Sequence, residues 1–253
     1  MFPGVPPSCL VRIFPSAVSS VRHIARSVRI LPHDALLHSS RQGLSSRSYF
    51  TKQLRCILDT RARLRALPRH TGFRMPPEIT DLTIHDAYAA LVTNEQRNQQ
   101  IVADIIQAVR EGRTPLVLTN RTDHIERLAS GLSEIQYVLI LKGGMGKKQC
   151  QAAAEMLTSI PDGTPRVLLA TGSYIGEGFD DSRLDTLFLT MPISWRGTLQ
   201  QYVGRLHRIH HNKKIVRVFD YVDSLVPMLA RMYEKRLKVY RAIGYEMELD
   251  DQV

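Results

Sequence analysis

The stretch that decides the fold runs from residue 167 to residue 208. It reads VLLATGSYIGEGFD at 167–180, LDTLFLTMP at 184–192 and QQYVGRLHR at 200–208. Two apolar runs of strand length each lead into a segment of glycine, carboxylate and arginine. Such runs are typical of buried parallel strands, because helices cover both faces of a parallel sheet. Polar segments directly after them are typical of an α/β nucleotide site.

The chain on both sides of this stretch alternates between strand and helix. Apolar runs predict strands over 116–119, 137–141, 166–170, 186–190 and 215–221. Helical spacing of apolar residues predicts helices over 94–111, 125–131, 147–160, 198–207 and 225–243. This alternation indicates right-handed crossovers in an open sheet. We therefore expect an α/β fold consisting of a single doubly wound domain with a mostly parallel sheet.

The charge of the chain is concentrated near its N-terminus. At 253 residues and 43% hydrophobic content the chain can bury a substantial core. Residues 1–74 carry 13 Lys or Arg and only two acids, whereas residues 75–253 carry 21 Lys or Arg and 22 acids. The net charge of +10 is therefore weak evidence for nucleic-acid binding by the domain itself.

The N-terminal segment is rich in Arg, Ser and Pro and shows no sustained helical or strand period up to about residue 64. We expect residues 1–72 to form a disordered or weakly structured basic leader. An acid-poor, Arg- and Ser-rich N-terminus is also typical of a mitochondrial transit peptide. The expected localisation is cytoplasmic, with mitochondrial as the alternative. The domain is expected over 73–245 and an acidic tail over 246–253.

Neither a membrane span nor a metal site is expected. No apolar run approaches the ~20 residues that a membrane helix needs. The cysteines Cys9, Cys56 and Cys150 form no Cys-x-x-Cys pair, which argues against a zinc ribbon and a disulfide scaffold. The His-x-x-His-His cluster at 207–211 has no cysteine nearby and is weak evidence for a metal.

Two loops that follow predicted strands carry polar or basic residues. Thr119, Asn120 and Arg121 precede a helix, so they can hold a phosphate or simply cap that helix. The loop KGGMGKK at 142–148 lacks the glycine spacing and the hydroxyl of a Walker phosphate loop. It is either a contact to nucleic-acid phosphates or a turn with solvated lysines.

Two further segments carry residues suited to phosphate. In the loop over 170–180, Thr171 can hydrogen-bond a phosphate, and Asp180 can accept from a ribose hydroxyl or a magnesium-bound water. A plain glycine-rich turn is the alternative for this loop. In the pattern QxxGRxxR at 201–208, Arg205 and Arg208 are expected on one face of a helix. There they can grip a γ-phosphate, although surface arginine pairs are also common.

Taken together, ATG…GEGFD followed by QxxGRxxR, each after a strand, resembles motifs V and VI of superfamily 2 helicases. The resemblance covers residues 73–245, which correspond to the second RecA-like domain of that family. The segments IGEGFD and MPISWRGTLQQY are most similar to those of bacterial DEAD/DEAH-like helicases related to type III restriction subunits. It implies an ATP-dependent DNA or RNA helicase or translocase. ATP with Mg²⁺ would lie in a cleft shared with a first RecA-like domain.

The resemblance also implies roles for three groups of residues. Arg205 and Arg208 would act as arginine fingers, and Gln201 would couple the nucleotide state to domain closure. The residues facing the nucleotide would be Gly176, Gly178 and Asp180. The residues contacting the backbone of DNA or RNA would be Thr119, Asn120, Arg121, Lys142, Gly143 and Thr171. Such contacts are made to phosphates and tolerate any base sequence.

The chain lacks the motifs that hold the phosphates and Mg²⁺ in this family. No Gly-x-x-x-x-Gly-Lys-Ser/Thr pattern occurs, and no Asp-Glu dipeptide follows an apolar strand. We therefore expect the C-terminal half of a helicase, inactive until it meets a Walker-containing RecA-like domain. The alternative is a stand-alone, non-catalytic nucleic-acid-binding module with the same fold.

Overall fold

The computed structural model describes residues 11–13, 62–76, 83–172, 181–193, 196–208, 210 and 213–248. Most of the predicted leader lies outside these residues. The same holds for the predicted nucleotide contacts Gly176, Gly178 and Asp180. The fold and the site are therefore described from the remaining parts of the chain.

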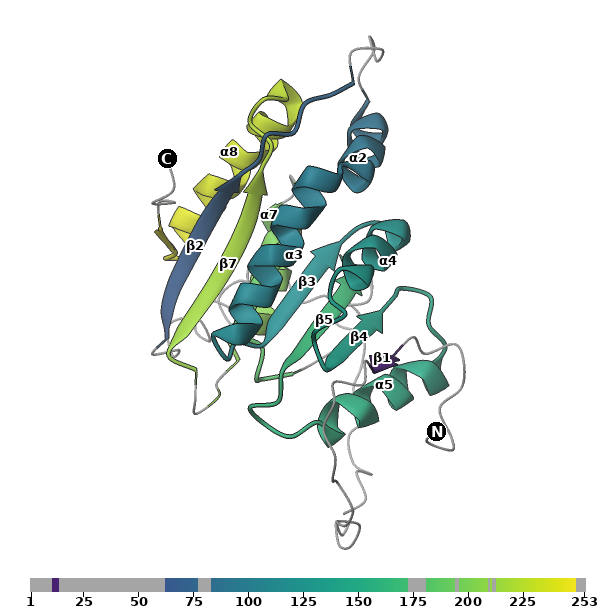
Figure 1. The fold of residues 1–253 in the computed structure, drawn as a ribbon. Coiled ribbons are helices and arrows are strands. Elements are labelled where there is room, and N and C mark those ends of the chain that lie inside the picture. The colour runs from purple at the N-terminus through teal and green to yellow at the C-terminus, as the bar shows by residue number, and fades with distance from the viewer. Residues whose placement is uncertain are drawn as a thin grey trace, which may run out of the picture.

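One sheet forms the centre of the domain, with the strand order β1-β4-β5-β3-β6-β7-β2-β8 (Figure 1). Neighbouring strands run parallel throughout, except that β1 pairs antiparallel with β4. The strands are β1 (Val11–Ile13), β2 (Arg63–His70), β3 (Pro115–Thr119), β4 (Tyr137–Leu141), β5 (Arg166–Thr171), β6 (Thr186–Leu189), β7 (Ile215–Val222) and β8 (Glu246–Met247). The predicted α/β fold with a mostly parallel sheet is confirmed.

Helices cover both faces of this sheet (Figure 1). They are α2 (Ile84–Thr93), α3 (Glu95–Arg110), α4 (Thr122–Ser130), α5 (Lys147–Ser159), α7 (Arg196–Leu206) and α8 (Pro227–Ala242). Val117 of β3 packs with α3 and α4 on one face. Leu116 and Leu118 pack with α5, α7 and α8 on the other. Because successive strand residues point to opposite faces and both faces are buried, β3 reads as a continuous apolar run.

The helix α2 was not predicted, and it covers the carboxyl edge of the sheet. Its residues Ala87 and Leu91 pack with Phe73, Met191 and Leu229, which follow the carboxyl ends of β2, β6 and β7. The side chain of Thr83 accepts from the backbone N–H of Asp86, and the Asp86 carboxylate accepts from the backbone N–H of Thr83. This reciprocal capping box fixes where α2 begins.

The sheet begins earlier in the chain than the sequence predicted. Arg63–His70 was assigned to the basic leader, and this assignment is wrong because the segment forms β2 between β7 and β8. In the sequence its arginines resemble a run of solvent-exposed charges. In the structure Arg65 pairs with Glu248 at 2.7 Å, and Arg69 pairs with Asp104 at 3.0 Å. The short strand β8 likewise lies in the segment predicted as an acidic tail.

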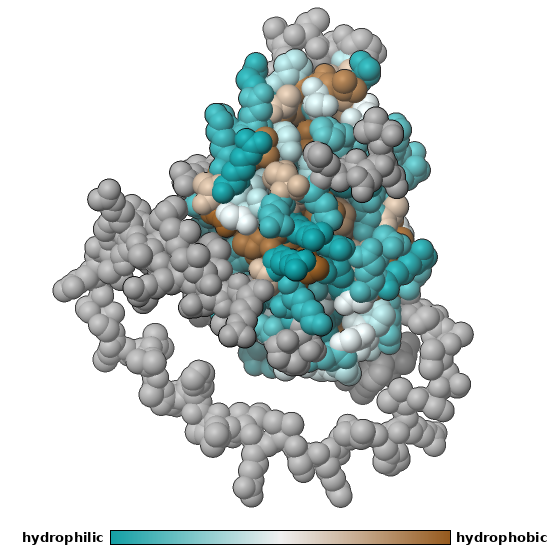
Figure 2. Space-filling view, turned by 90° about the vertical axis from the view of Figure 1, so that its left-hand side faces the viewer, coloured by the Kyte–Doolittle hydropathy of each residue, from teal (hydrophilic) through white to brown (hydrophobic). Residues whose placement is uncertain are grey.

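The surface exposes little apolar material among the described residues. Figure 2 shows the side on which β2 lies, where hydrophilic residues surround small apolar areas. Leu225 is an exposed large hydrophobic residue, at 47%. Within the described part of the chain, no helix combines the length and the apolar content needed to cross a bilayer.

Candidate functional site

Residues predicted to contact nucleic acid meet at the carboxyl ends of β3, β4 and β5. We call this place the carboxyl rim and define it as residues 119–121, 142–143 and 171–172. Thr119 and Thr171 are paired at the ends of neighbouring parallel strands, and Lys142 and Gly143 directly follow β4. The backbone N–H of Gly143 donates to Thr171 Oγ1 at 2.7 Å. The structure therefore brings three separate loops into one surface.

A buried hydrogen-bond chain supports the first loop of the rim. Nε2 of His124 lies 2.9 Å from Asn98 Oδ1, and its Nδ1 lies 3.0 Å from Thr119 Oγ1. The backbone N–H of Arg121 donates to the same Thr119 hydroxyl at 3.2 Å. Asn98 uses its amide nitrogen to donate to the carbonyl of Val92, which leaves Oδ1 as an acceptor. The network therefore assigns the imidazole proton to Nε2.

The charge state of His124 follows from its surroundings. Burial and, to a lesser extent, the positive charge of Arg97 lower the pKa of His124 to about 3. The neutral ring accepts from the Thr119 hydroxyl and donates to Asn98. Thr119 is 2% exposed, so its side chain supports the rim from inside. This geometry does not favour the predicted phosphate contact by Thr119, whereas Asn120 is exposed and Arg121 is half-exposed.

The cations of the rim both have acidic neighbours. Lys142 Nζ lies 2.5 Å from Glu126 Oε1, and Arg121 Nε lies 3.6 Å from Asp123 Oδ1. All four side chains are partly open to solvent, where an ion pair contributes about 0–1 kcal/mol. A polyanion can therefore replace these carboxylates at small cost.

The two arginines predicted as catalytic lie away from the rim. Arg205 is half-exposed in the last turn of α7, and Arg208 is exposed two residues beyond the end of the helix. Lys213 Nζ donates to the carbonyls of Leu206 and Arg208, and Lys213 precedes β7, so this end of α7 lies near the amino ends of the strands. The prediction that both arginines stand on one continuous helix face is wrong, because α7 ends between them. The exposed Gln201 lies one turn before Arg205.

The end of α7 is anchored by a buried histidine. His207 Nε2 lies 2.9 Å from the hydroxyl of Tyr245. Burial, followed by the charge of Lys213, lowers the pKa of His207 to about 4. The ring is therefore neutral at neutral pH and fixes the position of the helix end. No group of three or more His, Cys, Asp or Glu side chains suited to a metal ion occurs within the described segments.

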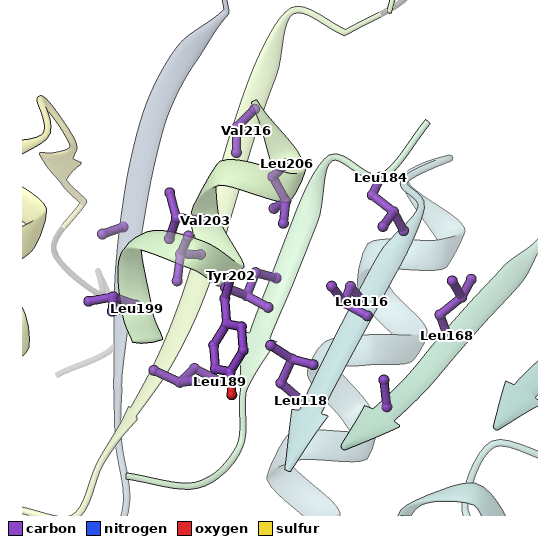
Figure 3. Packing of buried hydrophobic residues seen from close by; sticks show 14 of the residues in the cluster. Leu116, Leu118, Leu168, Leu184, Leu189, Leu199, Tyr202, Val203, Leu206 and Val216 are labelled. Carbon is purple, nitrogen blue, oxygen red and sulfur yellow. The ribbon is translucent and has the colours of Figure 1, made fainter. Parts of the chain in front are cut away.

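Tyr202 reaches from α7 to the carboxyl rim. The sequence did not single this residue out. Figure 3 shows its ring between Leu118 and Leu189, with the oxygen directed toward the carboxyl end of β3. A Cβ atom added to Gly172 would lie 2.0 Å from the Tyr202 hydroxyl and 3.3 Å from Asn120 Oδ1. Residue 172 therefore has to be glycine if the tyrosine is to reach the rim. In the sequence Tyr202 looks like an ordinary core residue of an amphipathic helix.

Two buried arginine–aspartate pairs fix the carboxyl end of β7. Arg236 of α8 contacts both oxygens of Asp220, at 2.8 and 2.9 Å. Arg97 of α3 contacts both oxygens of Asp223, at 2.9 and 3.2 Å. Bidentate geometry compensates the burial of these charges. Nothing in the local sequence indicates these pairs, because the partners come from separate elements.

Two viral proteins resemble the chain in sequence. No protein-family model matches it. Uncharacterized protein 108L of Invertebrate iridescent virus 3 is 35% identical over 103 residues, which make up 41% of this chain and 92% of that protein. The protein named Putative helicase 161L of Invertebrate iridescent virus 6 is 32% identical over 162 residues, 60% of this chain and 35% of that protein. The chain thus spans about a third of the length of 161L.

Similarity in structure extends the comparison to the fold. The crystal structure of T4 UvsW superposes with a TM-score of 0.58 and 15% sequence identity, covering 76% of this chain and 42% of that chain. At this identity the match concerns the fold alone. The chain has a RecA-like α/β fold, and it spans less than half the length of this neighbour.

Proposed function

We propose that this chain forms the second RecA-like domain of an ATP-dependent helicase or translocase. The premise is that the chain belongs to the same family as Uncharacterized protein 108L. The observation that carries the proposal is the match of 60% of the chain to a protein named as a putative helicase. The RecA-like fold supports it. The other domain would be a RecA-like domain with Walker motifs. The closer relation to type III restriction subunits stays a prediction.

Arg205 and Arg208 would face the phosphates of ATP. Guanidinium groups suit phosphate because they donate two parallel hydrogen bonds and stay charged. Arg208 is exposed and Arg205 is partly exposed, so an anion presented by another domain can reach them. Bound ATP with Mg²⁺ supplies the phosphoryl transfer that drives movement along the strand. Gly176, Gly178 and Asp180 keep the nucleotide-facing roles predicted for them. Gln201 keeps its predicted role of coupling the nucleotide state to domain closure.

The carboxyl rim would hold the backbone of DNA or RNA. Asn120 and Arg121 are exposed or half-exposed, and the ion pair of Lys142 can open toward a phosphate. Gly143 and Thr171 shape the rim through the hydrogen bond that joins them. Because phosphates repeat along every strand, such contacts hold any base sequence.

The isolated chain tests whether nucleic-acid binding and ATP hydrolysis require different RecA-like domains. We expect it to bind a fluorescein-labelled oligonucleotide and to show no phosphate release from ATP, with or without that oligonucleotide. Robust turnover by the purified chain would contradict the proposal, because this domain alone lacks the groups that hold the phosphates and Mg²⁺. A purified Walker-containing RecA-like domain added to the chain should bring activity.

A second candidate function is a stand-alone nucleic-acid-binding module without catalysis. The observation that favours it is the size of 108L, of which the 103 matched residues make up 92%. In such a module the rim would bind a strand in the same way, but Arg205 and Arg208 would have no nucleotide to face. Affinity for an oligonucleotide that stays the same whether or not ATP and a Walker-containing domain are present would favour the module.

A further inference from the structure

The Tyr202 hydroxyl is a polar group at the rim to which the proposed function gives no role. The side chain is 6% exposed, and its ring belongs to the buried cluster that includes Leu118, Leu189 and Val203. No hydrogen bond to this hydroxyl is formed by any residue that the structure describes. By contrast, the hydroxyl of Tyr245 is paired with His207. A fixed donor that no described residue pairs can hydrogen-bond a ligand in place of water.

We propose that the Tyr202 hydroxyl donates a hydrogen bond to a phosphate oxygen of a nucleic-acid backbone bound at the carboxyl rim. The proposal rests on the proposed function, because it assumes a strand on that surface. The hydroxyl lies against the backbone of Gly172 and near Asn120 Oδ1, so it shares the surface to which the strand is assigned. Phosphate oxygens accept hydrogen bonds and cannot donate them at neutral pH, which matches a lone O–H donor.

The protonation of Tyr202 suits this role. Burial raises its pKa above the ordinary value for tyrosine. The hydroxyl therefore keeps its proton at neutral pH and remains a donor. A tyrosinate would repel the phosphate instead.

The position of Tyr202 on α7 gives the contact a second consequence. Arg205 lies three residues further along the same helix, about 4.5 Å along its axis. Both residues belong to one rigid helix, so a strand bound at the Tyr202 hydroxyl and a nucleotide bound at Arg205 would act on the same element. Strand binding and nucleotide binding would then be linked through one rigid element.

The substitution Tyr202→Phe in the full chain removes the hydroxyl and keeps the ring. We expect the dissociation constant for a fluorescein-labelled oligothymidylate to rise about 3- to 10-fold, as for one lost hydrogen bond. The thermal unfolding midpoint should stay the same or rise, because no described partner of the hydroxyl is lost. The matched control is Tyr245→Phe, which removes the bond to His207. It should lower the unfolding midpoint and leave the affinity unchanged.

The contact with Gly172 is tested by a double-mutant cycle. Gly172→Ala places a methyl group where the hydroxyl lies, 2.0 Å away, so it should lower the unfolding midpoint and weaken strand binding. Combining it with Tyr202→Phe should restore part of the midpoint, because the colliding oxygen is gone. Purely additive midpoints would contradict the close approach of these two residues.

Three outcomes separate the inference from the proposed function. If the wild-type chain binds the oligonucleotide and Tyr202→Phe binds it equally well, the inference is overturned and the proposed function stands. If the wild-type chain does not bind nucleic acid, both are overturned. If Tyr202→Phe weakens binding of a fluorescent ADP analogue and leaves oligonucleotide affinity unchanged, the hydroxyl serves the nucleotide, and its assignment to the strand is wrong.

Discussion

The carboxyl rim and the end of α7 would serve one enzyme from different ends of the sheet, and they are built differently. The rim is held from inside by neutral His124 and by the hydrogen bond between Gly143 and Thr171. At the end of α7 the backbone is anchored by His207 and Lys213, while Arg208 lies beyond the helix. The internal support of the rim would suit a surface that receives any strand, whereas Arg208, exposed beyond the anchored helix, would suit contact with another domain.

The largest expected effect comes from Arg208→Ala in the enzyme reconstituted with a Walker-containing domain. Removing an arginine that stabilises charge in the transition state should lower the ATP turnover rate about 10³-fold. Oligonucleotide affinity should stay within about twofold, because Arg208 lies away from the rim. The two quantities are measured by phosphate release and by fluorescence anisotropy. Equal losses in both quantities would contradict separate roles for the rim and the end of α7, and would indicate that Arg208 contacts the strand.

His124→Ala tests the inner support of the rim. It leaves the Thr119 hydroxyl and Asn98 Oδ1 without their partner and opens a cavity, so the free energy of unfolding should fall by about 3 kcal/mol. Oligonucleotide affinity should fall as well, because the backbone of Arg121 loses its support. The control His207→Ala should also lower stability, measured by urea unfolding, yet leave the affinity unchanged. Loss of affinity in both variants would show that the rim is not separately supported.

Both histidines make stability depend on pH in the same direction. Their folded pKa values, about 3 for His124 and about 4 for His207, lie below the unfolded value of 6.5. Stability is therefore complete above pH 6.5 and decreases as the pH falls toward the folded values, because the unfolded state takes up the protons first. Between pH 6.5 and pH 5 each group should remove on the order of 2 kcal/mol. Urea unfolding of wild type and His124→Gln at pH 7 and pH 5 should show a smaller loss in the variant.

Lys142→Ala should give the smallest change. It removes one phosphate contact, so binding should weaken a few-fold for all base sequences, and the slope of log affinity against log salt should decrease by about 1. Glu126→Gln frees the same lysine from its ion pair and should strengthen binding. Opposite signs for the two variants would sharpen the assignment of the rim, and a change of the same sign would contradict it.

Local pattern was sufficient for the strands in the middle of the sheet. Each of β3 to β6 is buried on both sides, so its apolar run does not depend on the details of the loops. The strand β2 could not be recognised, because the partners that neutralise Arg65 and Arg69 are Glu248 and Asp104, both remote in sequence. The α/β class was therefore predictable from local sequence, whereas β2 depends on contacts that only the folded chain supplies.

The candidate site divides in a similar way. Which loops meet at the rim follows from strand direction, so Asn120, Lys142 and Thr171 could be grouped from sequence. The inward role of Thr119 depends on His124 arriving from α4, and the reach of Tyr202 depends on a glycine in another element. Such roles arise from tertiary packing and leave no periodicity in the chain.

The place of β2 in the sheet affects the order in which the protein assembles. During synthesis β2 leaves the ribosome before β3 to β8. Its partner strand β7, Ile215–Val222, emerges about 150 residues later. At about 5–20 residues per second this is a wait of roughly 8–30 s. During that time the edge of β2 is open to pairing with other nascent chains, because the strand that covers it is among the last to be made.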